Sequence, residues 1–204
     1  VEHNSAGQGG QAPEDRFGML SNDEATIFVR GAQPVIADNI VRNNQVAAIN
    51  INANALNHFI TTDVGRSTGH ADLLEGYADN QGALVRGNQL ANNGINGMVV
   101  RGGTLTTQVV MDDTDIVHVV LDEIVVPDFH TFGGVRLESS PNESLVVKFS
   151  GPVAGLTASG RPLDIEDRIG GSVQVVGQPG KPVILTGLAD DTVGAGFEPD
   201  GTPQ

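Results

Sequence analysis

The chain has 204 residues, enough to bury one sizeable core, and that core must be aliphatic, since 39% of residues are hydrophobic but only 4% are aromatic. The net charge of −14 argues against nucleic acid or an anionic membrane as a partner, because both require clustered lysine and arginine, and only Lys148 and Lys181 are lysines. Cysteine is absent, which excludes disulfides and thiolate metal sites.

Residues 1–24 are expected to form an N-terminal segment that ends in a cap. Val1–Ala12 is rich in Gly, Gln and Asn and contains no apolar run long enough for a signal peptide or a membrane span. We therefore expect no membrane insertion. Because the sequence starts at Val1 rather than Met, we also expect a processed product or a segment of something longer. Pro13–Leu20 is predicted to form a short helix, with its proline near the first turn and acidic residues at the positive end of the dipole. Such a helix would cover the open end of a stacked β-structure.

Residues 25–189 are predicted to form one domain of short β-strands with Asn, Gly or Pro at the corners. Gly31–Asn52 is echoed 49 positions later by Asn80–Arg101, and Leu137–Phe149 is echoed 38 positions later by Val175–Gly187. Short β-branched runs that recur without helical spacing are typical of stacked coils, none of which can bury its apolar face alone. The sequence therefore predicts an all-β fold, a parallel β-helix.

Asparagine is the residue expected at the bends of these coils. It tolerates left-handed backbone angles, and its side chain can bond to nearby main-chain groups. Equivalent asparagines of successive coils can stack into an amide ladder. The 49-residue repeat predicts two such pairs, Asn39 with Asn88 and Asn43 with Asn92.

The regular pattern changes in three places. Thr61–Asp79 breaks the repeat and is predicted to be an insertion with a short helix, since the stretch from Gly69 onward has helical spacing. After Gly102 the strands become rich in valine and alternate, which indicates one inward and one solvated face. Residues 190–204 are predicted to be a tail or linker. The side chains expected to point inward are Ile27, Val29, Val35, Ile49, Leu84, Val99, Val119, Val125, Leu137, Val147, Val175 and Ile184.

The densest polar cluster is Asp112, Asp113, Asp115 and His118. On a strand, Asp113 and Asp115 would project to one face, where two carboxylates could share a calcium ion or flank a glycosidic bond. Acidic corner residues are equally explained as ordinary solvated turns. The five histidines never appear at metal-ligand spacing, and no nucleophile motif or phosphate-binding glycine loop occurs. We assign no catalytic residue, and calcium is the one cofactor the sequence suggests.

Two resemblances cover roughly residues 25–200. The Asn-punctuated stretch Thr26–Gly103 resembles the right-handed parallel β-helix, or pectin-lyase-like, superfamily, which includes pectate lyases, polygalacturonases, phage tailspikes and adhesins. Met111–Gly151 and Asp164–Phe197 resemble a module that recurs in very large secreted proteins of environmental bacteria. The first resemblance implies a right-handed solenoid. It carries over no catalytic residue, because the Gly-His-Gly and Arg-Ile-Lys strings of the polygalacturonase-like enzymes are missing.

These patterns favour a non-enzymatic structural protein outside the cell or on its surface, a self-assembling subunit of a bacterial filament, sheath or stalk. The ends of a β-helix expose unpaired main-chain groups, and this chain has few lysines to repel another edge. We expect other copies to bind head to tail through the termini, with Val1–Leu20 adding to a neighbour. The alternative is a module of the lyase or glycosidase type that binds or cleaves carbohydrate, with polysaccharide as its partner.

Overall fold

A computed structural model of the protein describes residues 24–32, 34–56, 83–127, 134–159 and 171–195. Within these ranges the fold is all-β, and the only helical element is the 3-10 turn η1 (Ala53–Ala55). The two short helices predicted within Pro13–Leu20 and Gly69–Asp79 lie outside the described residues.

Sixteen strands are found in the described ranges. In chain order they are β1 (Ala25–Val29), β2 (Val35–Ala37), β3 (Ile40–Arg42), β4 (Ala47–Asn52), β5 (Leu84–Arg86), β6 (Gln89–Ala91), β7 (Ile95–Arg101), β8 (Gly103–Thr104), β9 (Gln108–Met111), β10 (His118–Val120), β11 (Glu123–Val126), β12 (Gly134–Glu138), β13 (Leu145–Phe149), β14 (Gly155–Ala158), β15 (Ser172–Val176) and β16 (Val183–Gly187).

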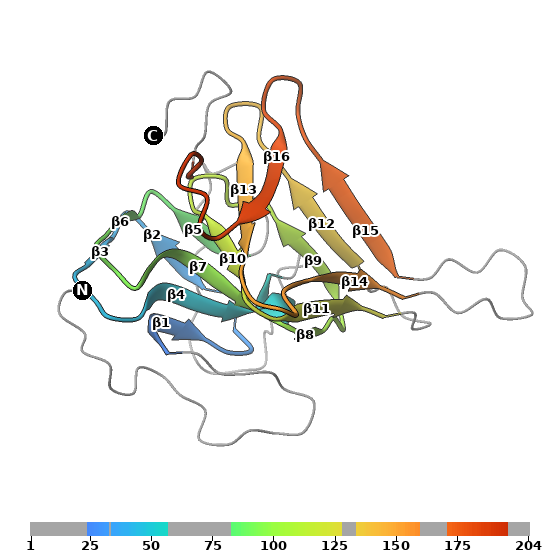
Figure 1. Ribbon diagram of the computed structural model, residues 1–204, viewed down its shortest axis with the longest axis horizontal. Coiled ribbons are helices and arrows are strands. Elements are labelled where there is room, and N and C mark those ends of the chain that lie inside the picture. Colours follow the sequence, from blue (N-terminus) through green and yellow to red (C-terminus); the bar gives the residue numbers. More distant parts are fainter. Residues whose placement is uncertain (1–23, 33, 57–82, 128–133, 160–170, 196–204) are drawn as a thin grey trace, which may run out of the picture.

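The strands form five sheets, and every strand pair within them is parallel (Figure 1). The largest sheet has the order β1-β4-β7-β10-β13-β16. Two three-stranded sheets have the orders β14-β11-β8 and β15-β12-β9, and the two-stranded sheets are β2-β5 and β3-β6. Neighbouring strands of the large sheet are not consecutive in the chain, because the chain forms strands of the smaller sheets between one strand of the large sheet and the next.

Each return to the six-stranded sheet completes one pass of the chain, and the strand register gives the length of each pass. Ala25 pairs with Ala47, 22 positions later, and Ile49 pairs with Met98, 49 positions later. The next three passes span 20, 29 and 38 positions, from Met98 to His118, to Val147 and to Leu185. The two repeats seen in the sequence are therefore the second and the fifth pass.

One face of the six-stranded sheet carries a single stack of side chains through all passes. Along the register its members are Ile27, Ile49, Met98, His118, Val147 and Leu185. We call this set the inner stack. Its four middle members are fully buried, and the apolar ones belong to the main hydrophobic cluster. The two end members, Ile27 and Leu185, each have one neighbouring strand in the sheet and are not fully buried.

The opposite face of the same sheet is buried as well. Val99, Val119 and Val146 form a second apolar cluster there, against which Val193 and Ala195 pack. Lys148 Nζ donates a 2.6 Å hydrogen bond to the main-chain oxygen of Asp190 and holds this covering segment down. The described part of the predicted tail, residues 190–195, therefore lies over the sheet. Residues 196–204 are outside the described ranges.

The predicted inward set is wrong at specific positions, and the reasons differ. Val35 is 49% exposed because β2 directs the next residue, Ile36, into the core. Val125 is only half-buried for the same reason, since its neighbours on β11 take the inward positions. Val175 is also 49% exposed, although its register partner Leu137 is fully buried. No described strand covers β15 on its outer side, so an inward-facing position there stays in solvent.

Arg101, the last residue of β7, joins the first three passes. Its guanidinium donates to the main-chain oxygen of Val29 at 2.7 Å and to Asn50 Oδ1, and it lies 4.2 Å from the ring centre of Phe28. The side chain is almost fully buried. Charged hydrogen bonds in a buried site are strong, and their loss leaves acceptors without water.

We predict that Arg101→Met lowers the free energy of unfolding by about 2–4 kcal/mol, because both acceptors lose their donor in a buried site. Arg136→Met is the matched control, since Arg136 pairs with Glu138 on the partly exposed face of β12 and should cost no more than about 1 kcal/mol. Urea unfolding followed by circular dichroism measures both. If both variants lower the free energy of unfolding equally, the stabilising role given to the buried hydrogen bonds of Arg101 is contradicted.

Candidate functional site

The first polar corner follows β2 and β5. The chain turns there through Asp38 and Gly87, both with positive φ (58° and 67°). Asn88 Oδ1 accepts hydrogen bonds from the main-chain N–H and the side-chain amide of Asn39, each at 3.1 Å. Asn88 Nδ2 donates to the Ile36 oxygen at 2.6 Å. Glycine suits position 87 because of its positive φ, and a Cβ there would also lie 2.3 Å from Asp38 Oδ1 and displace that side chain.

The second polar corner follows β3 and β6 and contains the other predicted pair. Asn92 Nδ2 donates to Asn43 Oδ1 at 2.9 Å, and both residues have left-handed backbone angles. The residues that follow form a further pair, in which Asn44 Nδ2 donates to Asn93 Oδ1 at 2.8 Å. This third pair was not predicted, although Asn44 and Asn93 stand 49 positions apart in the same repeat. The repeat therefore contained the signal for it.

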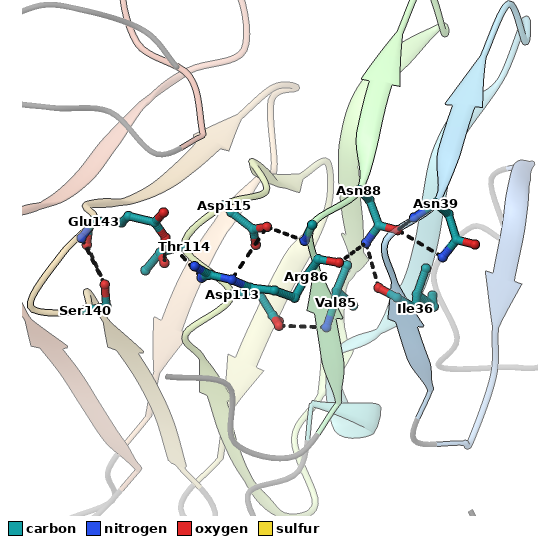
Figure 2. A network of polar contacts seen from close by, with 11 residues as sticks. Ile36, Asn39, Val85, Arg86, Asn88, Asp113, Thr114, Asp115, Ser140 and Glu143 are labelled. Atoms are coloured by element: carbon teal, nitrogen blue, oxygen red, sulfur yellow. Dashed lines mark hydrogen bonds and ion pairs between the residues drawn. The ribbon is translucent and has the colours of Figure 1, made fainter. Parts of the chain in front are cut away.

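Two aspartates continue the first corner where its strands end. Among the described residues the sheet β2-β5 has no third strand, yet Val85 N–H donates to Asp113 Oδ1 at 3.0 Å and Gly87 N–H donates to Asp115 Oδ2 at 2.6 Å. Figure 2 shows these contacts side by side, on the side of β5 opposite to Asn39. Carboxylate oxygens thus occupy the place that the carbonyls of another strand would take.

The network extends through charged side chains into the following pass. Arg86 Nη1 donates to Glu143 Oε2 at 3.0 Å, and its Nε lies 3.9 Å from Asp115 Oδ2. Thr114 Oγ1 donates to the same Glu143 oxygen at 2.7 Å. Desolvation raises the pKa of Asp115, and the Gly87 N–H and the Arg86 charge oppose this increase. Residues from three passes are therefore joined at one corner (Figure 2).

The three aspartates suggested for calcium do not assemble into a ligand set. Asp113 and Asp115 do face one side, but each uses an oxygen to accept a main-chain N–H, and Asp112 is itself buried. Calcium needs six to eight converging oxygens. Within the described ranges, no group of three or more His, Cys, Asp or Glu residues is placed to hold a metal ion. The arrangement suits closing a sheet edge better than binding a cation.

His118 lies in the inner stack between Met98 and Val147 and is fully buried. Its Nε2 is 3.9 Å from Asp113 Oδ2. Burial lowers the pKa of His118 to about 4, and the main chain of Ile116 offsets only part of this effect. The imidazole is therefore neutral near pH 7 and behaves as a core side chain.

The last pass presents a different kind of surface. Val173, Val175 and Leu185 are 39%, 49% and 48% exposed, although their register partners on β12 and β13 are almost fully buried. Figure 1 shows β15 and β16 at the outer edge of their sheets. These three apolar side chains, together with the edges of β14, β15 and β16 that no described strand pairs with, are called the open end below. Inward-facing residues are exposed here because the described chain adds no further pass.

Comparison with known proteins gives no match. No family model, no curated protein and no solved structure is similar to the chain. Within the described ranges, no helix is long and apolar enough to cross a membrane. Two features of the described residues bear on function: the open end, and the first polar corner with its extension through Asp113, Asp115 and Glu143, called the polar corner below.

We predict that Asn88→Ala lowers the free energy of unfolding by about 1–3 kcal/mol, because it removes the bonds to Asn39 and leaves the Ile36 oxygen without its donor. The matched control is Asn142→Ala at an exposed turn, where the described bond uses the main-chain N–H, with an expected change within about 0.5 kcal/mol. Chemical denaturation compares the two. If Asn142→Ala lowers the free energy of unfolding as much as Asn88→Ala does, the claim that the Asn39–Asn88 pair stabilises the stack is contradicted.

The buried histidine predicts a pH dependence of stability. The unfolded chain binds a proton at His118 below pH 6.5, whereas the folded chain binds it only near pH 4. The free energy of unfolding should therefore fall as the pH drops from 6.5 towards 4, by up to about 3 kcal/mol from this group. His118→Met should flatten that part of the profile. Parallel profiles for the parent protein and the variant between pH 4 and 6.5 would contradict the assignment.

Proposed function

We propose that this protein is a right-handed parallel β-helix that serves as a non-enzymatic structural subunit and associates end to end with further copies. Support for the solenoid comes from the exclusively parallel pairing and from the repeated return of the chain to one sheet. Connections between parallel strands of one sheet are right-handed in nearly all proteins, which supports the handedness. The resemblance of residues 26–103 to the pectin-lyase-like superfamily agrees with both.

The open end is the single observation that carries the functional proposal. Apolar positions that are buried in the middle passes are exposed in the last one, next to strand edges that no other described strand pairs with. Burial of apolar surface is worth roughly 25 cal/mol per Å², so covering this end is favourable. Exposed edges of this kind also promote pairing with another chain.

The polar corner supports a structural role for the remaining polar residues. Asp113, Asp115 and Glu143 each accept hydrogen bonds from neighbouring passes. A group held in this way stabilises the stack. We therefore propose that the surface that binds other copies is the open end, and that the assembly is a filament, sheath or stalk outside the cell. The acidic composition and the resemblance to secreted bacterial modules are consistent with that location.

The proposal predicts that the purified protein forms linear assemblies whose length increases with concentration. Leu185→Lys should weaken association at least about tenfold, because a charge must then be buried at the contact. Ile40→Lys is the matched control, because Ile40 is 52% exposed on β3 and points away from the core. Sedimentation velocity and electron microscopy measure both. An intact protein that stays monomeric at high concentration, or a control that dissociates equally, would contradict the proposal.

A further inference from the structure

The two outer strands of the six-stranded sheet have the same direction. β1 and β16 stand at opposite ends of an order in which every pair is parallel. If β1 of a second copy is placed beside β16, the sheet can continue without a change in strand direction. That geometry repeats at the far end of the second copy and leads to an open chain of copies.

The main chain of β16 offers half of its amides to such a strand. Leu188 N–H donates to the Phe149 oxygen at 2.9 Å, on the β13 side. Main-chain groups of alternate residues in a parallel strand face opposite neighbours, so Ile184 and Thr186 also face β13. The N–H groups of Val183, Leu185 and Gly187 and the C=O groups of Val183 and Leu185 therefore face the outer edge, whereas the Gly187 oxygen accepts the Asp190 N–H at 3.0 Å.

The inner stack specifies the register of an added strand. It runs from Ile27 on β1 to Leu185 on β16, and only these two end members are not fully buried. With Ile27 of a second copy opposite Leu185, the stack continues across the contact as one apolar column. The exposed side of Leu185 would then be covered as Val147 is covered within the chain.

Charges at the ends of the two strands favour the same orientation. Glu24 precedes β1 and Arg30 follows it, whereas Lys181 precedes β16 and Asp191 follows it. With Ile27 opposite Leu185, Glu24 lies opposite Pro182, next to Lys181, so opposite charges approach each other at the start of the two strands. An antiparallel β1 would bring like charges together. Such charges select orientation more than they add affinity.

We propose that the occupant of the open end is β1 of a second copy, added in parallel to the free edge of β16 with Ile27 opposite Leu185. This inference rests on the end-to-end association proposed above and names its contact and register. The strands β14 and β15 of the first copy would then flank the N-terminal pass of the second.

The chain has no cysteine, so single cysteines report this contact without interference. Neighbouring strands are about 4.8 Å apart, within the Cα range of a disulfide. Ile27→Cys and Leu185→Cys proteins are mixed and oxidised with copper phenanthroline. We expect covalent dimers on the order of tenfold faster than for Leu185→Cys mixed with Ile40→Cys, because the contact raises the effective concentration of the thiols. The pair Ala25→Cys and Val183→Cys, equivalent in register, replaces the first pair if Ile27→Cys does not fold.

The outcomes separate the two proposals. If the parent protein associates in sedimentation but the mixed pair cross-links no faster than the Ile40→Cys control, the β1 contact is wrong and end-to-end association stands. If Leu185→Cys cross-links mainly to itself, the contact is a closed two-fold dimer, and the inferred register is wrong. If the parent protein does not associate at any concentration, the proposed function fails together with the contact.

Discussion

The parallel main-chain ladder of the six-stranded sheet is the constraint on which the rest of the structure depends. Each pass of the chain must bring a strand back beside the previous one, whatever length of chain lies between. A pass of 20 positions and a pass of 49 positions both return a strand to the sheet in register, because the extra residues of the longer pass can form loops between the sheets. The inner stack follows from this constraint, and so does the exposure of Leu185 where the ladder stops.

Side chains replace the ladder wherever the smaller sheets end. Asparagine pairs join the ends of β2 and β3 to the ends of β5 and β6. The carboxylates of Asp113 and Asp115 accept hydrogen bonds from the main-chain N–H groups of Val85 and Gly87, on the side of β5 away from β2. An amide in that position would otherwise lose its partner without full access to water, at a cost of about 1–3 kcal/mol. The same acidic cluster that suggests a calcium site in the sequence is thus accounted for by the geometry of β5.

Much of the stacking is predictable from the sequence, because a repeat of corner residues reports the register directly. The echoes at 49 and 38 positions match the pairing of Val35 with Leu84 and of Leu145 with Val183. The link between Asp113 and Val85 could not be predicted, because it joins positions 28 apart that no repeat relates. The sequence predicts that Val99 and Val119 point inward, but both are buried on the opposite face, in the second apolar cluster, because alternation does not reveal which segment covers a strand.

Hydrogen exchange resolved at single amides in β16 tests most directly whether the described stack ends there with an open edge. In dilute protein, the Thr186 and Leu188 amides should exchange slowly, and the Leu185 and Gly187 amides should exchange quickly, because only the first two face β13. On raising the protein concentration, the Leu185 and Gly187 amides should become protected. Strong protection of Leu185 in the dilute monomer, or no change on concentration, would contradict the account.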